Sequence, residues 1–183
     1  MAVPPPAPFS KPALRRALRA ARLSAVGRIV PVPPAFAAAL RPGLIVASYH
    51  AIGGEADPTE LVEAARTAGC TVLLPHVVDH ETPLRFLRWD GEALAAGPFG
   101  LSQPGIIAHE AAPDIILTPL VGFDRQGNRL GQGAGHYDRA FAAHPSAWRV
   151  GIALALQEVP ALEPDPWDVP LHAIATEKEW IVP

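Results

Sequence analysis

The sequence predicts an α/β fold with three α/β/α layers, in which a mostly parallel sheet lies between helices. Six short apolar stretches have the composition of strands, and stretches with helical periodicity lie between several of them. Strands that alternate with helices along a chain are typical of a parallel sheet covered on both faces. At 183 residues, the chain is long enough to bury a substantial core.

The chain begins with a stretch rich in proline, residues 1–9, which we predict to be a disordered arm. Ser10 is a suitable N-cap for a helix over residues 11–25, because apolar residues recur there on one face. A second, short helix is predicted over residues 33–41, and Pro-Gly ends it. Residues 10–183 are expected to form a single domain.

The later elements follow from apolar runs separated by turn-forming residues. Two more helices are expected over residues 59–68 and 139–144. The segment 82–89 alternates apolar and polar residues, which favours a strand at the edge of the sheet. Together with it, strands are expected over residues 44–49, 71–75, 114–118, 149–155 and 172–177.

Composition argues against several function classes. The formal net charge is −3, so no overall basic field suggests a nucleic-acid partner. No apolar run reaches the roughly 18 residues of a membrane span, and the first residues lack the regions of a signal peptide. We therefore expect a cytoplasmic protein, without a membrane partner, that acts as a monomer. The single cysteine, Cys70, adjoins an apolar strand and is expected to be buried. His76 and His80 lack a third ligand cluster, so zinc is not expected.

Residues 129–139 contain three glycines at alternate positions, between a predicted strand and a predicted helix. Glycine allows positive φ and close approach of the backbone to a ligand, and free N–H groups at such a loop bind anions. Arg129 and Arg139 bracket the loop with guanidinium groups suited to phosphate, and Asp138 is placed to hold Mg²⁺ against phosphate oxygens. We interpret the segment as a phosphate-binding loop; the alternative is a glycine-rich turn that only reverses the chain.

The longer segment GFDRQGNRLGQGAGHYDR, residues 122–139, resembles the signature of the 5-formyltetrahydrofolate cyclo-ligase family, also called methenyltetrahydrofolate synthetases. That pattern runs roughly G-x-x-F-D-x-x-G-x-R-L-G-x-G-x-G-Y-Y-D. The sequence departs from it at His136, where the family usually has a tyrosine. Gln132 is neutral, whereas some relatives carry a basic ligand contact between the first two glycines. The resemblance extends from Lys11 to Glu177 and is weakest over residues 76–113.

This resemblance implies an ATP- and Mg²⁺-dependent ring closure of 5-formyltetrahydrofolate to 5,10-methenyltetrahydrofolate, with release of ADP and phosphate. The family's first helix carries a Lys-x-x-x-Arg motif that reaches the ATP phosphates, and Lys11 and Arg15 match it. With Arg129, they are the implied catalytic residues. The implied ATP contacts are Lys11, Arg15, Arg129, Leu130, Gly131, Gln132, Gly133, Ala134, Gly135, His136 and Tyr137.

Tyr49 and Glu55 follow the strand predicted over 44–49, at the end where ligands bind in open α/β sheets. Family members carry a folate-contacting glutamate after this strand, which Glu55 matches; the alternative is a carboxylate that stabilises the next helix start. The implied folate contacts are Tyr49, Glu55, Phe99, His136 and Tyr137, although Phe99, Phe86 and Trp89 fit a core equally well. The implied metal ligands are Asp138 and Asp165, with Asp168 as the second choice.

Two other interpretations remain open from the sequence. Lys11, Arg15, Arg19 and Arg22 form a basic stripe on the first helix, and a stripe of this kind is often only a solvated face. We expect Arg19 and Arg22 to be surface charges. The alternative function is a non-catalytic protein of the same fold that binds nucleotide or folate without turnover. The carboxylates suited to Mg²⁺ favour the enzyme.

Overall fold

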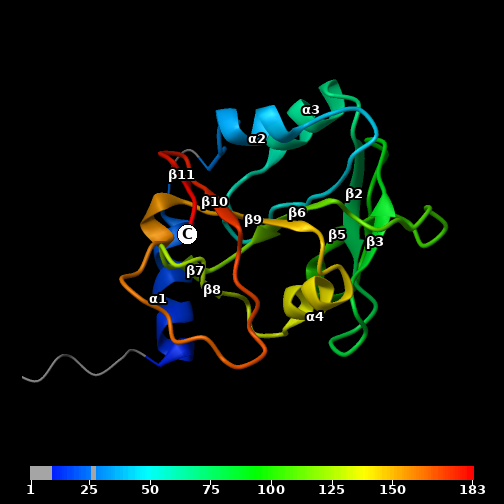
Figure 1. Cartoon of the computed structure of the whole chain (residues 1–183). Coiled ribbons are helices and arrows are strands. Elements are labelled where there is room, and N and C mark those ends of the chain that lie inside the picture. The colour runs from blue at the N-terminus through cyan, green and yellow to red at the C-terminus, as the bar shows by residue number, and fades with distance from the viewer. Residues whose placement is uncertain (1–9, 26–27) are drawn as a thin grey trace, which may run out of the picture.

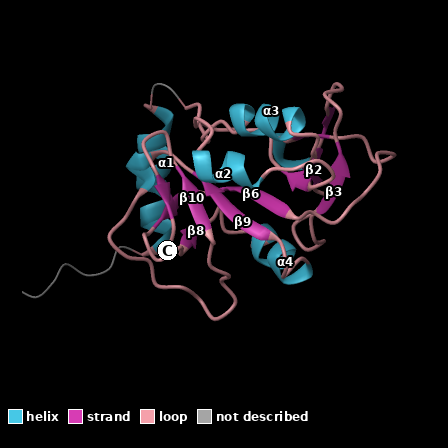
Figure 2. Ribbon diagram, turned by 45° about the horizontal axis from the view of Figure 1, so that its top comes forward, coloured by secondary structure: helices cyan, strands magenta, loops and turns pink. Residues whose placement is uncertain are grey.

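A computed structural model of the chain describes residues 10–25 and 28–183. The predicted proline-rich arm, residues 1–9, lies outside the described residues. Figures 1 and 2 show a central sheet with helices above and below it. The α/β/α arrangement predicted from the sequence is therefore confirmed.

The central sheet has seven strands in the order β11-β10-β9-β6-β1-β2-β3. Strands β10, β9, β6, β1 and β2 pair in parallel, whereas β3 and β11 pair antiparallel to their neighbours at the two ends. The segment predicted as an edge strand is thus at the edge. The strands are β1 Ile45–Ala47, β2 Thr71–His76, β3 Arg85–Arg88, β6 Ile115–Pro119, β9 Trp148–Ile152, β10 Ala173–Ala175 and β11 Trp180–Ile181.

Within residues 10–25 and 28–183, four α-helices accompany the sheet: α1 Lys11–Leu23, α2 Pro34–Ala39, α3 Thr59–Thr67 and α4 His136–Ala143. Figure 1 shows α2 and α3 on one side of the sheet and α4 on the other. Two two-stranded ribbons, β4 Ala95–Ala96 with β5 Ser102–Gln103 and β7 Gly122–Phe123 with β8 Arg129–Leu130, lie outside the central sheet. Short 3₁₀ turns cover Pro98–Gly100 (η1) and Ala155–Gln157 (η2). No helix in the described part of the chain is long and apolar enough to span a membrane.

Each face of the sheet has its own core, because successive side chains of a strand point to opposite faces. In β6, Ile115 and Leu117 belong to the cluster that contains Phe36 of α2. Ile116, between them, belongs to the cluster that contains Phe141 of α4. Burial on both faces explains why this strand reads as a continuous apolar run.

The amphipathic helix α1 does not cover the central sheet but packs on the β7–β8 hairpin (Figure 1). Leu18 contacts Val121 and Leu130 in a third apolar cluster. A Cβ atom at Gly122 would lie 2.6 Å from Leu18 Cδ1, so any larger residue there would require Leu18 to shift where helix and hairpin approach. This contact places the basic stripe of α1 beside the glycine loop that follows β8.

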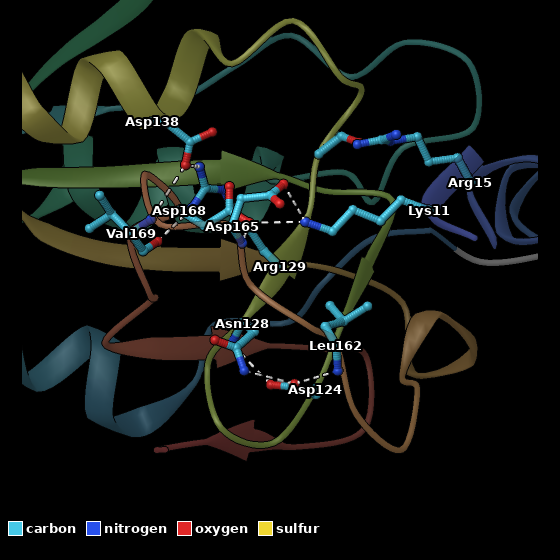
Figure 3. Close-up of polar contacts among 11 residues, drawn as sticks. Lys11, Arg15, Asp124, Asn128, Arg129, Asp138, Leu162, Asp165, Asp168 and Val169 are labelled. Atoms are coloured by element: carbon cyan, nitrogen blue, oxygen red, sulfur yellow. Dashed lines mark hydrogen bonds and ion pairs between the residues drawn. The ribbon is translucent and has the colours of Figure 1, made fainter. Parts of the chain in front are cut away.

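A buried aspartate in the hairpin turn fixes the loop that later enters the site. Asp124 accepts hydrogen bonds from the N–H groups of Gln126 and Asn128, both at 3.0 Å. Its other oxygen accepts from the N–H of Leu162 at 2.9 Å. Figure 3 shows this link between the hairpin and the segment that leads to residues 165–168.

Candidate active site

A cavity of about 730 Å³ opens at the carboxyl ends of the central strands, where Tyr49 follows β1, Pro75 lies in β2 and Pro119 ends β6. This is the position expected for a ligand site in an open α/β sheet. The basic face of α1 and the glycine loop form other parts of its wall. The predicted site residues that line it are Lys11, Arg15, Tyr49, Glu55, Arg129, Leu130, Gly131, Gln132, Gly133, Ala134, Gly135, His136, Tyr137, Asp138, Asp165 and Asp168.

Phe99 belongs to the residues named from the sequence, but its side chain lies outside the described part of the structure. The apolar lining of the cavity comes instead from residues such as Val77, Leu84 and Leu101. Phe86, considered above as an apolar wall, is 1% exposed and packs in the core. The alternative of core packing is therefore correct for Phe86.

The glycine loop connects β8 to α4 and has the backbone conformation that glycine allows. Gly133 has φ +110° and Gly135, the N-cap of α4, has φ +68°. Arg15 of α1 donates from Nε to the carbonyl oxygen of Gly131 at 2.9 Å. The loop is therefore held against α1 and leads directly into a helix N-terminus, as anion sites commonly do.

Arg139 has a different role from the one expected for it. Its Nη1 donates to the carbonyl of Ala134 at 3.0 Å, and its Nη2 donates to the carbonyl of His80 at 2.8 Å. Nη2 also lies 3.0 Å from His136 Nδ1. Arg139 is not among the residues that line the cavity, so the structure does not bring it together with the other predicted site residues. It stabilises the glycine loop through its bond to the Ala134 carbonyl.

Lys11, near the start of α1, meets two carboxylates from the last third of the chain (Figure 3). Its Nζ lies 2.6 Å from Asp165 Oδ2 and 3.3 Å from Asp168 Oδ2. Burial opposes the charged form of Lys11, but the hydrogen bonds to both aspartates outweigh burial and raise the pKa of the ammonium. Lys11 is therefore a permanent cation within the cavity.

Arg129 is 5% exposed at its side chain and connects three segments of the site. It donates to the carbonyl oxygen of Val169 at 2.6 Å and to Asp138 Oδ1. Its guanidinium carbon also lies 4.6 Å from the centre of the Phe141 ring. These contacts fasten the hairpin, the first turn of α4 and the residues after Asp168 to one another.

The carboxylates of this region suit a hard divalent cation. Asp138 accepts the bonds from Arg129 and the Val169 N–H at a single oxygen, and Figure 3 shows the other oxygen pointing away from them. Asp165 and Asp168 belong to one turn, in which the Asp165 N–H donates to Asp168 Oδ2 at 2.8 Å. Among the described residues, no group of three or more His, Cys, Asp or Glu side chains is placed to hold a metal. Magnesium commonly uses one or two carboxylates with phosphate oxygens and water, so the donor set fits Mg²⁺ bound together with a nucleotide.

At the other side of the cavity, Glu55 is 7% exposed. Its Oε2 accepts from the Ile52 N–H at 3.2 Å, and its Oε1 accepts from Gln132 Nε2 at 3.2 Å. Burial raises the pKa of Glu55, and the Ile52 N–H, Arg22 and Gln132 partly oppose that rise. The buried Tyr137 hydroxyl has a pKa raised by burial and by Glu55, so it stays protonated.

These features match one known family along most of the chain. The model of the 5-formyltetrahydrofolate cyclo-ligase family matches residues 36–177. The chain belongs to this family. A 5-formyltetrahydrofolate cyclo-ligase of Haemophilus influenzae is 36% identical over 138 residues, which cover 70% of this chain and 73% of that protein. The Escherichia coli protein of the same name is 34% identical over 144 residues, covering 74% and 79%.

Solved structures agree with this cyclo-ligase assignment. The Aquifex aeolicus 5,10-methenyltetrahydrofolate synthetase superposes with a TM-score of 0.75 at 28% identity, and the match covers 94% of this chain and 92% of that chain. A synthetase of Mycoplasma pneumoniae has the same fold, with a TM-score of 0.66 at 23% identity over 92% and 99% of the two chains. Membership of the cyclo-ligase family makes this protein a ligase.

Two residues that line the cavity, Arg22 and Trp167, were not predicted as site residues from the sequence. Arg22, expected at the surface, is 3% exposed and lies with Nη1 4.0 Å from Glu55 Oε1. Its position on the same helix face as Lys11 and Arg15 was the available indication. Trp167 lines the cavity at 68% exposure, beside the acidic turn. Arg19 is exposed, as expected, but it bonds to Gln132.

Proposed function

We propose that this ligase converts 5-formyltetrahydrofolate and ATP to 5,10-methenyltetrahydrofolate, ADP and phosphate, with Mg²⁺ as cofactor. The observation that carries the proposal is the cavity itself. It combines a phosphate-type loop, cations from α1 and carboxylates beside them with a separate buried glutamate. One half therefore suits a metal–nucleotide complex, and the half around Glu55 suits a heterocycle with N–H donors.

The chemistry requires activation of a poor electrophile. The formyl group on N5 is amide-like, so its oxygen first attacks the γ-phosphorus of ATP and ADP leaves. N10 then attacks the formyl carbon, the C–O bond breaks, phosphate leaves and N10 loses its proton. The ring closes as a methenyl bridge. Phosphoryl transfer of this kind needs positioning and charge neutralisation more than a protein nucleophile.

The residues around the loop supply these two requirements. Lys11 and Arg15 project from α1 toward the glycine loop and the acidic turn, where they would neutralise phosphate charge (Figure 3). The N–H groups of residues 131–135 would contact phosphate oxygens near the N-terminus of α4. Arg129 contributes mainly by holding Asp138, since its guanidinium is already bonded to that carboxylate.

Asp138 and a carboxylate of the Asp165–Asp168 turn would hold Mg²⁺. Bound there, Mg²⁺ would neutralise charge that develops on the transferring phosphoryl group. Two observations bear on which of these two aspartates would be the second Mg²⁺ ligand. The Asp165 side chain is the more exposed, at 46% against 24%. Asp168 directly precedes Val169, which is bonded to both Asp138 and Arg129.

Glu55 would fix the folate through its carboxylate, and Tyr137, Tyr49 and His136 would contact it from the walls. The Tyr49 hydroxyl donates to the carbonyl of Ala56 and its side chain belongs to a core cluster, so little of it is available to a ligand. We infer that the enzyme works as a cytoplasmic monomer on small molecules, without a nucleic-acid or membrane partner. A net charge of −3 supports the part of this inference that concerns nucleic acid.

The test is the appearance of the methenyl product, followed by its near-ultraviolet absorbance, with purified protein, 5-formyltetrahydrofolate, Mg²⁺ and ATP. We expect absorbance to rise only when ATP and Mg²⁺ are both present. Asp138→Ala should abolish the rise, whereas Asp90→Ala, at an exposed aspartate paired with Arg88, should not. Calorimetric binding of both substrates without product would instead favour the non-catalytic binding protein.

A further inference from the structure

Four polar side chains in the cavity wall form a chain that leaves α1 at Arg19, passes through Gln132 and Glu55, and returns to α1 at Arg22. Arg19 donates to Gln132 Oε1 from Nε at 3.0 Å and from Nη2 at 2.6 Å, and also to the Gln132 carbonyl at 3.2 Å. Gln132 Nε2 donates to Glu55 Oε1 at 3.2 Å. Arg22 Nη1 lies 4.0 Å from the same Glu55 oxygen.

The chemistry of the partners fixes the orientation of the Gln132 amide. A guanidinium only donates hydrogen bonds and a carboxylate only accepts them, so the amide oxygen must face Arg19 and its nitrogen must face Glu55. Gln132 itself is exposed and lies between Gly131 and Gly133, in the middle of the glycine loop. Its side chain is therefore the direct link between that loop and the buried Glu55.

The other end of the chain is rigid. Arg22 is 3% exposed and donates to the carbonyl oxygens of Leu120 and Gly53 at 3.3 and 3.1 Å. Among the described residues, no group bonds to its buried Nε atom. Glu55 faces this cation at 4.0 Å and accepts from the Ile52 N–H at its other oxygen, so Gln132 is its contact from the glycine loop.

We propose that Gln132 is a positioning residue that couples nucleotide binding at the glycine loop to folate binding at Glu55. The inference rests on the proposed function, because it takes the loop as the phosphate site and Glu55 as the folate site. Phosphate held by the loop N–H groups fixes the Gln132 backbone, and a fixed Gln132 side chain holds the Glu55 carboxylate in one orientation. The folate then meets a carboxylate that is already placed.

Coupling of this kind is reciprocal and can be measured without turnover. The probes are 5-formyltetrahydrofolate and a nucleotide whose γ-phosphoryl group cannot be transferred, the β,γ-imido analogue of ATP, with Mg²⁺. Calorimetry gives the Kd of the folate with and without the analogue. For the wild-type protein we expect the analogue to tighten folate binding by about fivefold or more, the lower range for coupled sites.

Two substitutions separate the links of the chain. Gln132→Met removes the amide and keeps the length, so the side-chain bonds to Arg19 and Glu55 are both lost, whereas the bond from Arg19 to the Gln132 carbonyl remains. Gln132→Glu keeps an acceptor for Arg19, removes the donor to Glu55 and places a second carboxylate beside Glu55. Both variants should reduce the ratio of the two folate Kd values to about twofold or less, which is below the range typical of coupled sites. Gln126→Met and Gln126→Glu, at an exposed glutamine in the hairpin turn, are matched controls that should keep the wild-type ratio.

A purely structural role for Gln132 would weaken folate binding equally with and without the analogue, leave the ratio unchanged and overturn the inference. A wild-type protein that binds both probes with a ratio of one would also overturn it, while leaving the proposed function intact. A wild-type protein that binds neither probe would overturn both. Loss of the ratio in both Gln132 variants, with normal ratios in the Gln126 variants, would establish the coupling.

Discussion

Lys11 Nζ and Asp165 Oδ2 lie 2.6 Å apart, although 154 positions separate the two residues in the chain. Both side chains remain partly exposed, at 30% and 46%. An ion pair with this exposure contributes only about 0–1 kcal/mol to stability. On the proposed function, Lys11 would therefore exchange a carboxylate for a nucleotide phosphate at little cost, and the acidic turn would then be free to bind a cation.

Replacing Lys11 by methionine tests this exchange. We expect Lys11→Met to raise the KM for ATP by about tenfold or more, because a charge-assisted hydrogen bond contributes about 1.5–3 kcal/mol. The Kd of the folate and the free energy of unfolding should change little. Steady-state kinetics, calorimetry and urea denaturation measure these quantities. Lys178→Met, at an exposed lysine outside the cavity, is the matched control, and an equal rise in its KM would contradict the assignment.

The carboxylates can be ranked by their effect on the Mg²⁺ requirement. Asp138→Asn should lower kcat/KM at limiting Mg²⁺ by at least the 10- to 100-fold typical of a disturbed metal site. Of Asp165→Asn and Asp168→Asn, the variant that removes the second ligand should raise the Mg²⁺ concentration needed for half-maximal rate. Mg²⁺ titrations of all three variants identify that ligand. An unchanged Mg²⁺ requirement in every variant would exclude this metal site.

Two glycines of the loop differ in what they tolerate. Gly133 has φ +110°, a conformation that disfavours side chains, whereas a Cβ at Gly131 meets no atom within 4 Å. We expect Gly133→Ala to destabilise the protein by about 1 kcal/mol or more and to raise the KM for ATP. The free energy of unfolding of the control, Gly131→Ala, should lie within about 0.5 kcal/mol of that of the wild type. Equal effects in denaturation curves would show that loop conformation is not the cause.

Burial of Glu55 makes stability depend on pH in a defined direction. Its pKa is raised in the folded state, so between the unfolded and folded pKa values the native protein binds more protons than the unfolded chain. The contribution of Glu55 to the free energy of unfolding therefore falls as pH rises through that window, and it is largest at lower pH. Glu55→Gln lacks this titration, so the difference in free energy of unfolding between wild type and variant should show the slope. Denaturation at a series of pH values measures the slope, and the opposite sign would refute the burial argument.

His136 makes the free energy of unfolding depend on pH in the opposite direction. Burial, together with Arg139 and His80, lowers the pKa of His136, so the unfolded chain binds the extra proton first as pH falls below the ordinary histidine value. The wild type should therefore lose stability on acidification through this titration, and His136→Tyr should lack this part of the loss. We also expect its kcat/KM to be equal or higher, because a tyrosine ring packs in the same place. A large loss of kcat/KM would show that the enzyme uses the imidazole itself.

The sequence predicted the parts of the fold that depend on local patterns. Apolar runs identified five strands of the central sheet, because strands buried on both faces are apolar throughout, and the alternation over residues 82–89 identified the edge strand β3. The sequence did not predict β11 or the β7–β8 ribbon, whose two-residue strands are too short for any periodicity. Helix α4 begins at His136, earlier than expected, because Gly135 in the left-handed conformation starts it directly after the loop.

The site residues also divide into those that a local sequence pattern predicted and those that depend on packing. The glycine loop is one continuous segment, so its residues and Asp138 were found from their spacing. Glu55 was found because it follows a strand. The burial of Arg22 and the bond between Gln132 and Glu55 depend on how α1 lies against the hairpin, and no local pattern encodes that packing. For the same reason, the basic stripe resembled a solvated face.

The close approach of Leu18 to Gly122 has a consequence for biosynthesis. The ribosome releases α1 first, but the hairpin that covers its apolar face is made about a hundred residues later, and Asp165 later still. Contacts so distant in sequence form slowly. During translation, Leu18 of α1 therefore stays uncovered until the hairpin is made, and the nascent chain acquires the proposed nucleotide half of the cavity only when synthesis is nearly complete.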